Sequence, residues 1–429
     1  MKSKKVLASI LSCAVIGATL AGCGSGSGSS AGSSSSKESS AASSESVSSE
    51  PINLTVWGSQ EDQELIKKMC EAFATANAGK TYNFTYGVVS EADAKQNVLK
   101  DISAAADVFG YASDQTAELV ASGALYRVTK NKENIIANST AASISAATVG
   151  KDLYGYPSSS DTYFMYYDKS KFTEDEAKSL DAMLSKDISG VSTNVAFDLD
   201  NGWYQCAFFF GAGCTLFGKD GSDATQCDFN NDRGLLVGEY LIDLAKNPKF
   251  GNNFDDGLVT AGFADGSLAA AITGTWNASA ISESLGENYA ATKLPTFTMS
   301  NGETVQMSGM ANFKIVGVNA ETKQPLESMA LAEWLTNYDN QLTRFEERSF
   351  APANAKLAGD TAALSANVAV SALAQQAQYA KVQTSIPQAG NYWTPAEAFG
   401  QDLIAGTVTK DNLQSKLDAY VESILATLS

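Results

Sequence analysis

The body of this chain opens with short apolar segments of strand character that alternate with amphipathic segments of helical character. The predicted strands and helices occupy, in order, residues 54–57, 62–77, 82–89, 93–106, 106–111 and 116–122. Parallel strands must be joined by crossover connections, which are usually helices. The alternation therefore predicts an α/β fold with a mainly parallel sheet that is covered by helices.

A second block of strands and helices follows. Further strands are predicted at residues 153–157 and 162–167, on either side of a proline break, and at 195–197, 268–273 and 313–318; further helices are predicted at 203–211, 234–246 and 325–337 and in the alanine-rich tail 359–429. A chain of 429 residues is too long for one ordinary core. Two α/β blocks predict two lobes that face a cleft, and clefts of this kind bind ligands beyond the strand ends.

Composition excludes several functional classes. The chain has 48 acidic and 30 basic residues, a formal charge of −18, which argues against a nucleic-acid partner because such proteins need a basic face. It contains no histidine, so Ser-His-Asp hydrolysis and His-ligated zinc are excluded. It also has no CxxC motif. We therefore expect neither a metal nor a cofactor.

The N-terminus has the features of a secretion signal. Three lysines precede an apolar stretch at residues 6–20, which is shorter than the roughly 20 residues of a membrane span. The stretch ends in Leu20-Ala21-Gly22-Cys23, which resembles the lipobox of bacterial lipoproteins and predicts lipidation of Cys23 after removal of residues 1–22. The alternative is a buried apolar helix with a chance cysteine. Residues 24–50 hold 15 serines and 4 glycines, a composition typical of a flexible tether.

Four cysteines lie in the body of the chain, at positions 70, 206, 214 and 227. Four cysteines in a body of this size are too few for a disulfide framework. Cys214 and Cys227 flank a turn-rich stretch and could pair across a hairpin. Separate buried thiols are the alternative, and the sequence leaves both open.

Aromatic residues recur beside glycine at strand ends and in loops, namely Tyr111, Trp203, Trp276, Tyr392 and Trp393. A pyranose ring has an apolar C–H face that packs on an indole or phenol, so such residues are candidate stacking groups for a sugar. The alternative for each one is ordinary core packing. Three acidic residues, Glu61, Asp114 and Asp161, also follow predicted strands. Carboxylates accept strong hydrogen bonds from hydroxyl groups, although most exposed carboxylates are only solvated.

Several stretches resemble one known family when taken in order. They are residues 106–114 leading to 121–125, 153–157 with 166–169, the segment 263–276, residues 294–297, and 386–388 leading to Trp393. In these stretches the chain is similar to the extracellular solute-binding proteins of carbohydrate ABC transporters, close to the maltose/maltodextrin-binding proteins. The resemblance runs over residues 52–429. It implies a two-lobed, periplasmic-binding-protein-like fold, in which each lobe is a mainly parallel sheet flanked by helices and the ligand cleft lies at the hinge.

The resemblance also implies domain limits and site residues. The N-terminal lobe would comprise residues 52–158 plus 308–357, and the C-terminal lobe 159–307 plus 358–429, after a tether at 23–51. Ligand-binding roles are implied for Tyr111, Asp114, Asp161, Trp203, Trp276 and Trp393, and less directly for Glu61 and Tyr392. Two departures concern the sugar contacts, because Gln115 stands where the family often has arginine and Asp62 where it often has lysine.

These features predict a binding protein rather than an enzyme. The expected function is that of a monomeric, lipid-anchored protein on the outer face of the cell membrane, which captures maltose or maltooligosaccharides and delivers them to the permease of an ABC importer. A binder of another oligosaccharide or polar solute is the first alternative. A cell-surface glycoside hydrolase is the second, and it would need two carboxylates placed across the scissile bond.

Overall fold

The computed structural model describes residues 50–427. Their strands are β1 (Ile52–Gly58), β2 (Tyr82–Val88), β3 (Val108–Ala112), β4 (Thr148–Val149), β5 (Asp152–Leu153), β6 (Tyr156–Asp168), β7 (Val195–Ala196), β8 (Phe250–Gly251), β9 (Ala270–Gly274), β10 (Tyr289–Thr292), β11 (Thr296–Thr298), β12 (Thr304–Gln306), β13 (Met310–Val318), β14 (Ala351–Pro352) and β15 (Lys381–Val382). The predicted signal peptide, the lipidated Cys23 and nearly all of the tether lie outside the described residues.

Helices separate most of these strands. The α-helices are α1 (Gln63–Ala76), α2 (Ala94–Lys100), α3 (Thr116–Ala121), α4 (Lys132–Asn138), α5 (Ala141–Ala146), α6 (Leu180–Ser185), α7 (Gly202–Gly211), α8 (Asp232–Ala245), α9 (Asp256–Asp265), α10 (Ala278–Leu285), α11 (Pro325–Leu335), α12 (Tyr338–Arg348), α13 (Ala355–Ala358), α14 (Thr361–Ala366), α15 (Val368–Ala377), α16 (Trp393–Ile404) and α17 (Leu413–Ile424). Short 3₁₀ turns are η1 (Gln60–Asp62), η2 (Ser113–Gln115), η3 (Glu176–Lys178), η4 (Thr275–Asn277), η5 (Gly286–Asn288) and η6 (Pro387–Tyr392).

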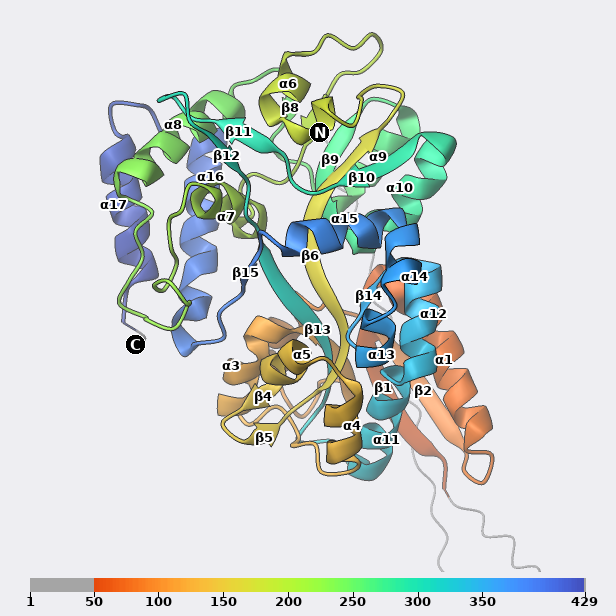
Figure 1. The fold of residues 1–429 in the computed structure, drawn as a ribbon. Helices are drawn as coiled ribbons and strands as arrows, with labels where there is room; N and C mark the ends of the chain where they lie inside the picture. Colours follow the sequence, from red (N-terminus) through yellow and green to blue (C-terminus); the bar gives the residue numbers. More distant parts are fainter. Residues whose placement is uncertain (1–49, 428–429) are drawn as a thin grey trace, which may run out of the picture. The chain divides into compact units, whose positions relative to one another are not determined.

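One sheet of eleven strands connects the two halves of residues 50–427, with the main order β2-β1-β3-β13-β6-β9-β7-β8. The outer strands pair in parallel on both sides: β2, β1 and β3 at one end, and β9, β7 and β8 at the other. The strands in between pair antiparallel. In Figure 1, β6 and β13 run between the two sets of parallel strands, and helices lie around both sets. The predicted parallel βαβ arrangement is therefore present in each half.

Strand β6 differs from the sequence-based expectation of two strands around a proline break. It is continuous from Tyr156 to Asp168 and passes through Pro157. Its first part pairs with β13, and from Tyr163 onward it pairs with β9. The β6–β13 register shifts between Lys314 and Ile315, next to Pro157. A bulge at this point lets the strand accommodate a residue that cannot donate a backbone hydrogen bond.

The helix expected at residues 93–106 is shorter than predicted, because α2 ends at Lys100. The next residue, Asp101, has extended backbone angles, and its carboxylate accepts hydrogen bonds from the backbone and hydroxyl of Ser103. An aspartate that bonds the backbone two residues ahead stabilises a turn in competition with the helix.

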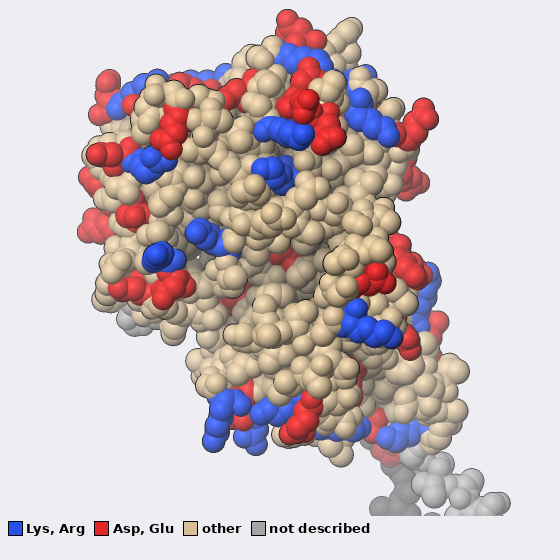
Figure 2. All heavy atoms as spheres, in the orientation of Figure 1, with Lys and Arg blue, Asp and Glu red and all other residues tan. Residues whose placement is uncertain are grey.

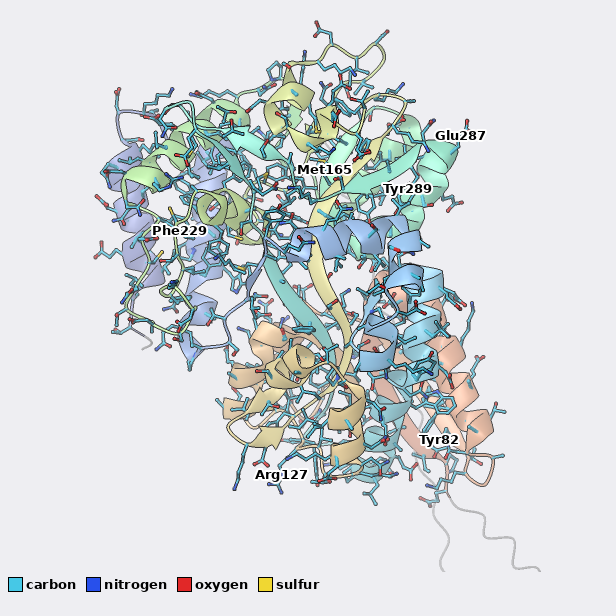
Figure 3. The ribbon with its side chains drawn as sticks, viewed as in Figure 1. Tyr82, Arg127, Met165, Phe229, Glu287 and Tyr289 are labelled. Atoms are coloured by element: carbon cyan, nitrogen blue, oxygen red, sulfur yellow. The ribbon has the colours of Figure 1, made fainter. Side chains whose placement is uncertain are left out.

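Two large hydrophobic clusters make up most of the core. One contains Leu54, Val108 and Tyr111 from the parallel strands of the first half, and the other is built around α7, α8, α16 and α17. In the second cluster the ring of Phe229 (Figure 3) stacks on Phe209 with centroids 4.4 Å apart. The three tryptophans at positions 203, 276 and 393 pack against this second cluster.

All four cysteines in residues 50–427 are free thiols. Cys214 and Cys227 lie on segments that approach each other at the bridge between Leu216 and Cys227, but the two do not form a disulfide. Of the two alternatives, separate thiols are therefore confirmed. Within the same residues, we find no helix long and apolar enough to cross a membrane.

Candidate binding site

A pocket of about 420 Å³ lies where the ends of β1, β3 and β9 meet the N-termini of α7 and α16. This volume is in the range of small-molecule binding sites. Six of the eight predicted ligand-binding residues line it: Glu61, Asp114, Asp161, Trp203, Trp276 and Trp393. The two exceptions are Tyr111 and Tyr392. We call the three carboxylates together with Asn312 the polar wall, and the three indoles the aromatic wall.

Two members of the polar wall occupy equivalent positions after neighbouring parallel strands. Glu61 lies in η1 close after β1, and Asp114 lies in η2 directly after β3. The carboxyl ends of parallel strands meet at one edge of a sheet, and the 3₁₀ turns extend that edge toward the pocket. Side chains 53 positions apart in sequence are therefore placed on the same wall.

Asp161 and Asn312 form the centre of the polar wall. They are direct cross-strand neighbours on β6 and β13, and each is 8% exposed. The Oδ1 atoms of both side chains have no hydrogen-bond partner in residues 50–427. Buried acceptors are normally satisfied, so two adjacent ones that line a pocket indicate a site for hydrogen-bond donors of a ligand.

The electrostatic environment of the acidic side chains is unusual. Burial raises the pKa of Asp161 to about 7, the charge of Lys314 opposes this rise, and the charge of Glu91 adds to it. Burial likewise raises the pKa of Asp114 to about 7, and the charge of Lys95 opposes the rise. The side chain of Asp114 is partly exposed at the pocket surface, whereas its carboxyl group is surrounded by protein atoms.

Gln115 is buried and supports the backbone around this wall. Its Nε2 donates to the carbonyls of Glu91 and Ala92, at 2.9 and 2.8 Å, and its Oε1 accepts from the backbone N–H of Lys95. The position at which the family often has an arginine therefore carries a neutral side chain whose polar atoms are already bonded.

Trp203, the first of the three indoles in sequence, lies in the first turn of α7. The side chain of Asn201 caps this helix by accepting a hydrogen bond from the backbone N–H of Trp203, at 3.0 Å. An N-cap of this kind fixes the start of a helix and so the direction of its first side chains. The indole contacts the buried Tyr163 edge-on, with centroids 5.2 Å apart.

Trp276 is held against the backbone by Gly274. A Cβ atom at Gly274 would lie 1.8 Å from Cζ3 of the indole, so only glycine leaves room for the ring in this place. The indole Nε1 donates to Oδ1 of Asp256 at 2.8 Å, and the same oxygen accepts from Nδ2 of Asn277 at 2.5 Å. The ring is thus fixed from two sides while one part of it lines the pocket.

Tyr392 does not line the pocket, contrary to the prediction. It is 1% exposed, and its hydroxyl donates to the carbonyl of Gly202 at 2.7 Å. The neighbouring Trp393 begins α16 and lines the pocket, with the two rings packed edge-on. The two neighbouring aromatic residues therefore have different roles. Tyr392 supports the backbone that precedes Trp203, and only Trp393 lines the pocket.

Tyr111 is also buried and does not line the pocket, contrary to the expectation for a stacking residue. It is fully buried in the core of the first half and lies opposite Ile315 of β13. Successive side chains of a strand point to opposite faces, so Ala112 lines the pocket while Tyr111 points into the core. The ring packs so closely on Gly317 that a Cβ there would lie 3.0 Å from Cε1.

The sequence reasoning missed several residues that line the pocket: Glu91, Lys95, Asp256, Asn312, Lys314 and Gln383. Glu91 follows the second predicted strand, the same kind of position that identified Glu61 and Asp114. Lys314 interrupts an otherwise apolar strand, which was also a usable signal. The amide of Asn312 donates to Gln383 Oε1 at 3.0 Å, a contact between segments 71 positions apart.

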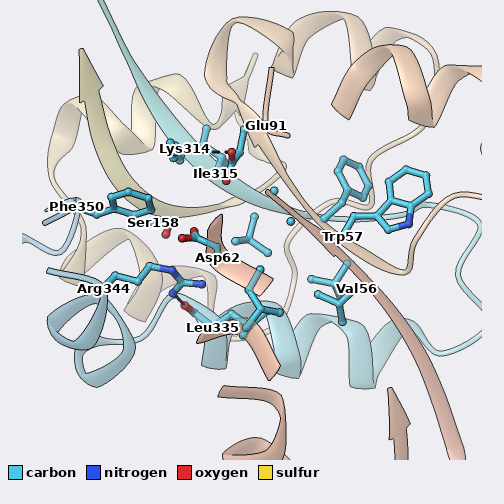
Figure 4. A pocket seen from close by; sticks show the side chains of 16 residues that line it. Val56, Trp57, Asp62, Glu91, Ser158, Lys314, Ile315, Leu335, Arg344 and Phe350 are labelled. Carbon is cyan, nitrogen blue, oxygen red and sulfur yellow. Dashed lines mark hydrogen bonds and ion pairs between the residues drawn. The ribbon is translucent and has the colours of Figure 1, made fainter. Parts of the chain in front are cut away.

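A charged cluster lies directly behind the pocket, around a small cavity of about 30 Å³ (Figure 4). Lys314 Nζ is 3.7 Å from the Glu91 carboxylate and 4.4 Å from the ring centroid of Phe350. The buried carboxylate of Asp62 is 3.0 Å from Nε of Arg348. Asp62 therefore has a structural partner in place of a ligand.

Arg348 connects the two walls. Besides its ion pair with Asp62, the residue after Glu61, it donates from Nη2 to the carbonyl of Trp276 at 3.3 Å. The guanidinium therefore contacts η1, which carries part of the polar wall, and η4, which carries part of the aromatic wall.

Comparison with known proteins identifies the family. The model of the bacterial extracellular solute-binding proteins matches residues 68–372. This chain belongs to that family. A galactooligosaccharide-binding protein of Bacillus subtilis (strain 168) is 31% identical over 449 residues, covering 99% of this chain and 97% of the relative. A maltooligosaccharide ABC transporter solute-binding lipoprotein of Streptococcus pneumoniae serotype 4 is 25% identical, covering 84% of this chain and 86% of the relative.

Solved structures of similar proteins confirm the two-lobed α/β fold. A structure solved with acarbose is 36% identical, with a TM-score of 0.80, and covers 87% of this chain and 98% of that chain. The maltodextrin-binding protein MalE1 from L. casei BL23, solved without ligand, has a TM-score of 0.73 at 24% identity, with 87% and 99% coverage. The family consists of substrate-binding proteins rather than enzymes.

Proposed function

We propose that this protein captures maltooligosaccharides outside the cell and delivers them to the membrane permease of an ABC importer. One observation carries the proposal: three partly buried indoles and a set of buried hydrogen-bond acceptors line the same pocket. The sugar-binding roles of Glu61, Asp114, Asp161, Trp203, Trp276 and Trp393 form part of this proposal.

The chemistry of a sugar ring fits these two walls. The C–H face of a pyranose is apolar and gains packing energy against an indole, which buries much surface at a small cost in side-chain entropy. Its hydroxyl groups donate hydrogen bonds, and a carboxylate such as Asp161 accepts bonds roughly twice as strong as those to a neutral acceptor. A ligand with one apolar face and a hydroxylated rim would satisfy both walls at once.

A galactooligosaccharide is the second candidate cargo, because the relative that is 31% identical over nearly the whole chain is named for that ligand. The maltooligosaccharide proposal is supported by the structure solved with acarbose and by the pneumococcal lipoprotein. Glucose and galactose differ in the direction of one hydroxyl group. Both sugars have an apolar face for the indoles, so the hydrogen bonds of the polar wall would distinguish them.

Calorimetry tests the proposed function directly. Residues 24–429 would be titrated with maltose, maltotriose, maltotetraose, galactobiose and galactotriose, with cellobiose and glucose as controls, and tryptophan fluorescence would be followed in parallel. We expect saturable 1:1 binding of the maltooligosaccharides. Tight binding of the galactose series alone would replace the cargo, and no binding of any sugar would refute the proposal.

We further propose the predicted division into lobes, with closure around the ligand as a hinge motion. Its support is that the core is divided into separate clusters on the two sides of the pocket. Small-angle X-ray scattering in solution would test this, because closure should lower the radius of gyration when a sugar that binds in the calorimetry is added. An unchanged radius at saturation would contradict closure.

Lipid anchoring through Cys23 belongs to the same proposal, and its support is the residue pattern at positions 2–23. The relative from Streptococcus pneumoniae is named a lipoprotein. Metabolic labelling of expressing cells with palmitate should label the wild type but not Cys23→Ala, and the variant should be found in the medium. Equal labelling of both would refute the assignment.

The absence of enzymatic activity is proposed as well. Incubation with maltotriose and maltohexaose should release no glucose. Release that is lost in Asp161→Asn or Asp114→Asn would support the hydrolase alternative instead.

A further inference from the structure

The charges around the pocket are not balanced. Two ammonium groups line it, and five carboxylates do: those of Glu61, Glu91, Asp114, Asp161 and Asp256. An uncharged sugar does not require such an excess, because neutral acceptors can also satisfy hydroxyl groups, although more weakly than carboxylates. The excess of negative charge should therefore affect which charged ligands the pocket accepts.

Both ammonium groups already have carboxylate partners. Nζ of Lys95 is 2.6 Å from the carboxylate of Glu118, which is outside the pocket lining. Nζ of Lys314 is 3.7 Å from that of Glu91, which also lines the pocket. The guanidinium of Arg348 is likewise engaged by Asp62. An anionic ligand would therefore have to compete with these carboxylates for the nearby cations.

Three carboxylates at the pocket form no ion pair with the part of the chain that the structure describes. None of the ion pairs found in residues 50–427 includes Glu61, Asp114 or Asp161, whereas Asp256 accepts hydrogen bonds from Trp276 and Asn277. The Asp161 side chain is more than nine-tenths buried, and its Oδ1 has no partner among the described residues. This oxygen is the independent sign that a donor from a ligand belongs there.

The raised pKa values agree with an uncompensated site. The groups that face Asp161 are Lys314 on β13, Glu91 after β2 and Asp256 on α9, so two of the three are acidic. A ligand cation placed among these groups would lower the pKa of Asp161, and a ligand anion would raise it further.

We propose that the pocket selects saccharides by charge: it rejects those that carry a carboxylate or sulfate, and it accepts those in which an ammonium group replaces a hydroxyl. This inference rests on the proposed function, since it assumes that the pocket binds sugars. An ammonium donor would form a charge-assisted hydrogen bond with the polar wall, while an anion would be buried against carboxylates without a partner.

The test uses three trisaccharides of one backbone that differ only at C6 of the non-reducing residue, which carries a hydroxyl, an amine or a carboxylate. The backbone is maltotriose, or galactotriose if the calorimetry described above favours the galactose series. Titrations at pH 8 in 50 mM salt should show the carboxylate at least about ten-fold weaker than the hydroxyl and the amine equal or tighter. The differences should shrink in 500 mM salt.

Variants identify the groups responsible. Asp161→Asn and Asp114→Asn should each reduce the ratio of amine to carboxylate affinity several-fold, because each removes one negative charge from the polar wall. Glu422→Gln removes a charge from the exposed face of α17 and should leave the ratio unchanged.

The outcomes separate the two proposals. A carboxylate trisaccharide that binds within two-fold of the hydroxyl parent, or a ratio that both aspartate variants leave unchanged, overturns selection by charge while sugar binding stands. Failure of every neutral saccharide to bind removes the proposed function itself.

Discussion

The two walls of the pocket are built in different ways. Each indole of the aromatic wall is fixed by residues close to it in sequence. A helix cap positions Trp203, the missing side chain of Gly274 leaves room for Trp276 (the glycine seat), and the buried Tyr392 packs on Trp393. The polar wall instead depends on pairing between distant strands, and its central oxygens have no partner in residues 50–427. The first wall is complete as folded, while under the proposed function a ligand would supply the donors that the second wall lacks.

This contrast predicts that the aromatic wall contributes most to affinity. Trp276→Ala should weaken binding of the neutral oligosaccharide by about 30-fold or more, as expected for a buried aromatic contact. The control is Trp334→Ala, which removes an indole that packs against the core of the first half. It should lower the melting temperature and leave calorimetric affinity intact. Equal losses in both variants would contradict the stacking role.

A substitution at Gly274, the glycine seat, offers a sharper test, because Gly274 itself does not line the pocket. Gly274→Ala should weaken binding by about ten-fold, since the added methyl group forces the Trp276 ring out of its place. Gly79→Ala is the matched control, because a Cβ at that position meets nothing within 4 Å. Unchanged affinity in Gly274→Ala would show that the indole position is not critical.

The polar wall should show opposite effects on binding and on stability. Asp161→Asn keeps one acceptor oxygen, so affinity should fall by about five-fold rather than more. The pKa of Asp161 is raised by burial to about 7, so its favourable contribution to stability is full below pH 4 and is lost as the pH rises through 7. The unliganded variant should therefore melt about 2 °C or more above wild type at pH 8.

The control for this stability effect is the same comparison of wild type and Asp161→Asn at low pH. At pH 4 the wild-type carboxyl is protonated in the folded protein, and the two melting temperatures should agree. A variant that is less stable than wild type at pH 8 would contradict the assigned environment of Asp161.

The smallest effects on affinity are expected for the two buried tyrosines. Tyr111→Phe and Tyr392→Phe should bind sugar within about two-fold of wild type, because neither ring lines the pocket. Tyr392→Phe should lose about 1 kcal/mol of stability with its hydrogen bond to Gly202, whereas the hydroxyl of Tyr111 has no partner in residues 50–427. Calorimetry and thermal melts would measure both, and a ten-fold loss of affinity would reinstate the original prediction.

The sequence predicted those parts of the fold that depend on local pattern. Alternating strands and helices indicated the parallel βαβ units, and glycine beside tryptophan indicated Trp203 and Trp276. Position after a strand does not say which face a side chain takes, and this is why the sequence did not show that Tyr111 points away from the pocket. The small neighbours Gly110 and Ala112 were the available signal, because they mark the face that is left open.

Other parts of the site depend on contacts that no local pattern encodes. Lys314 meets Glu91 across 223 positions, and Arg348 meets Asp62 across 286. The backbone neighbours of these residues give no sign of such partners. The same holds for Asp161 and Asn312, which become neighbours only through the register of β6 on β13.

The course of β6 has a consequence for any change of shape. The strand leaves β13 after Thr162 and joins β9 at Tyr163, two residues beyond Asp161, which lines the pocket. Under the proposed closure, a rotation between the halves would bend the strand at that peptide, next to the carboxylate that is proposed to accept hydrogen bonds from the ligand. If closure occurs as proposed, a substitution at this peptide should alter ligand affinity and the change in radius of gyration together.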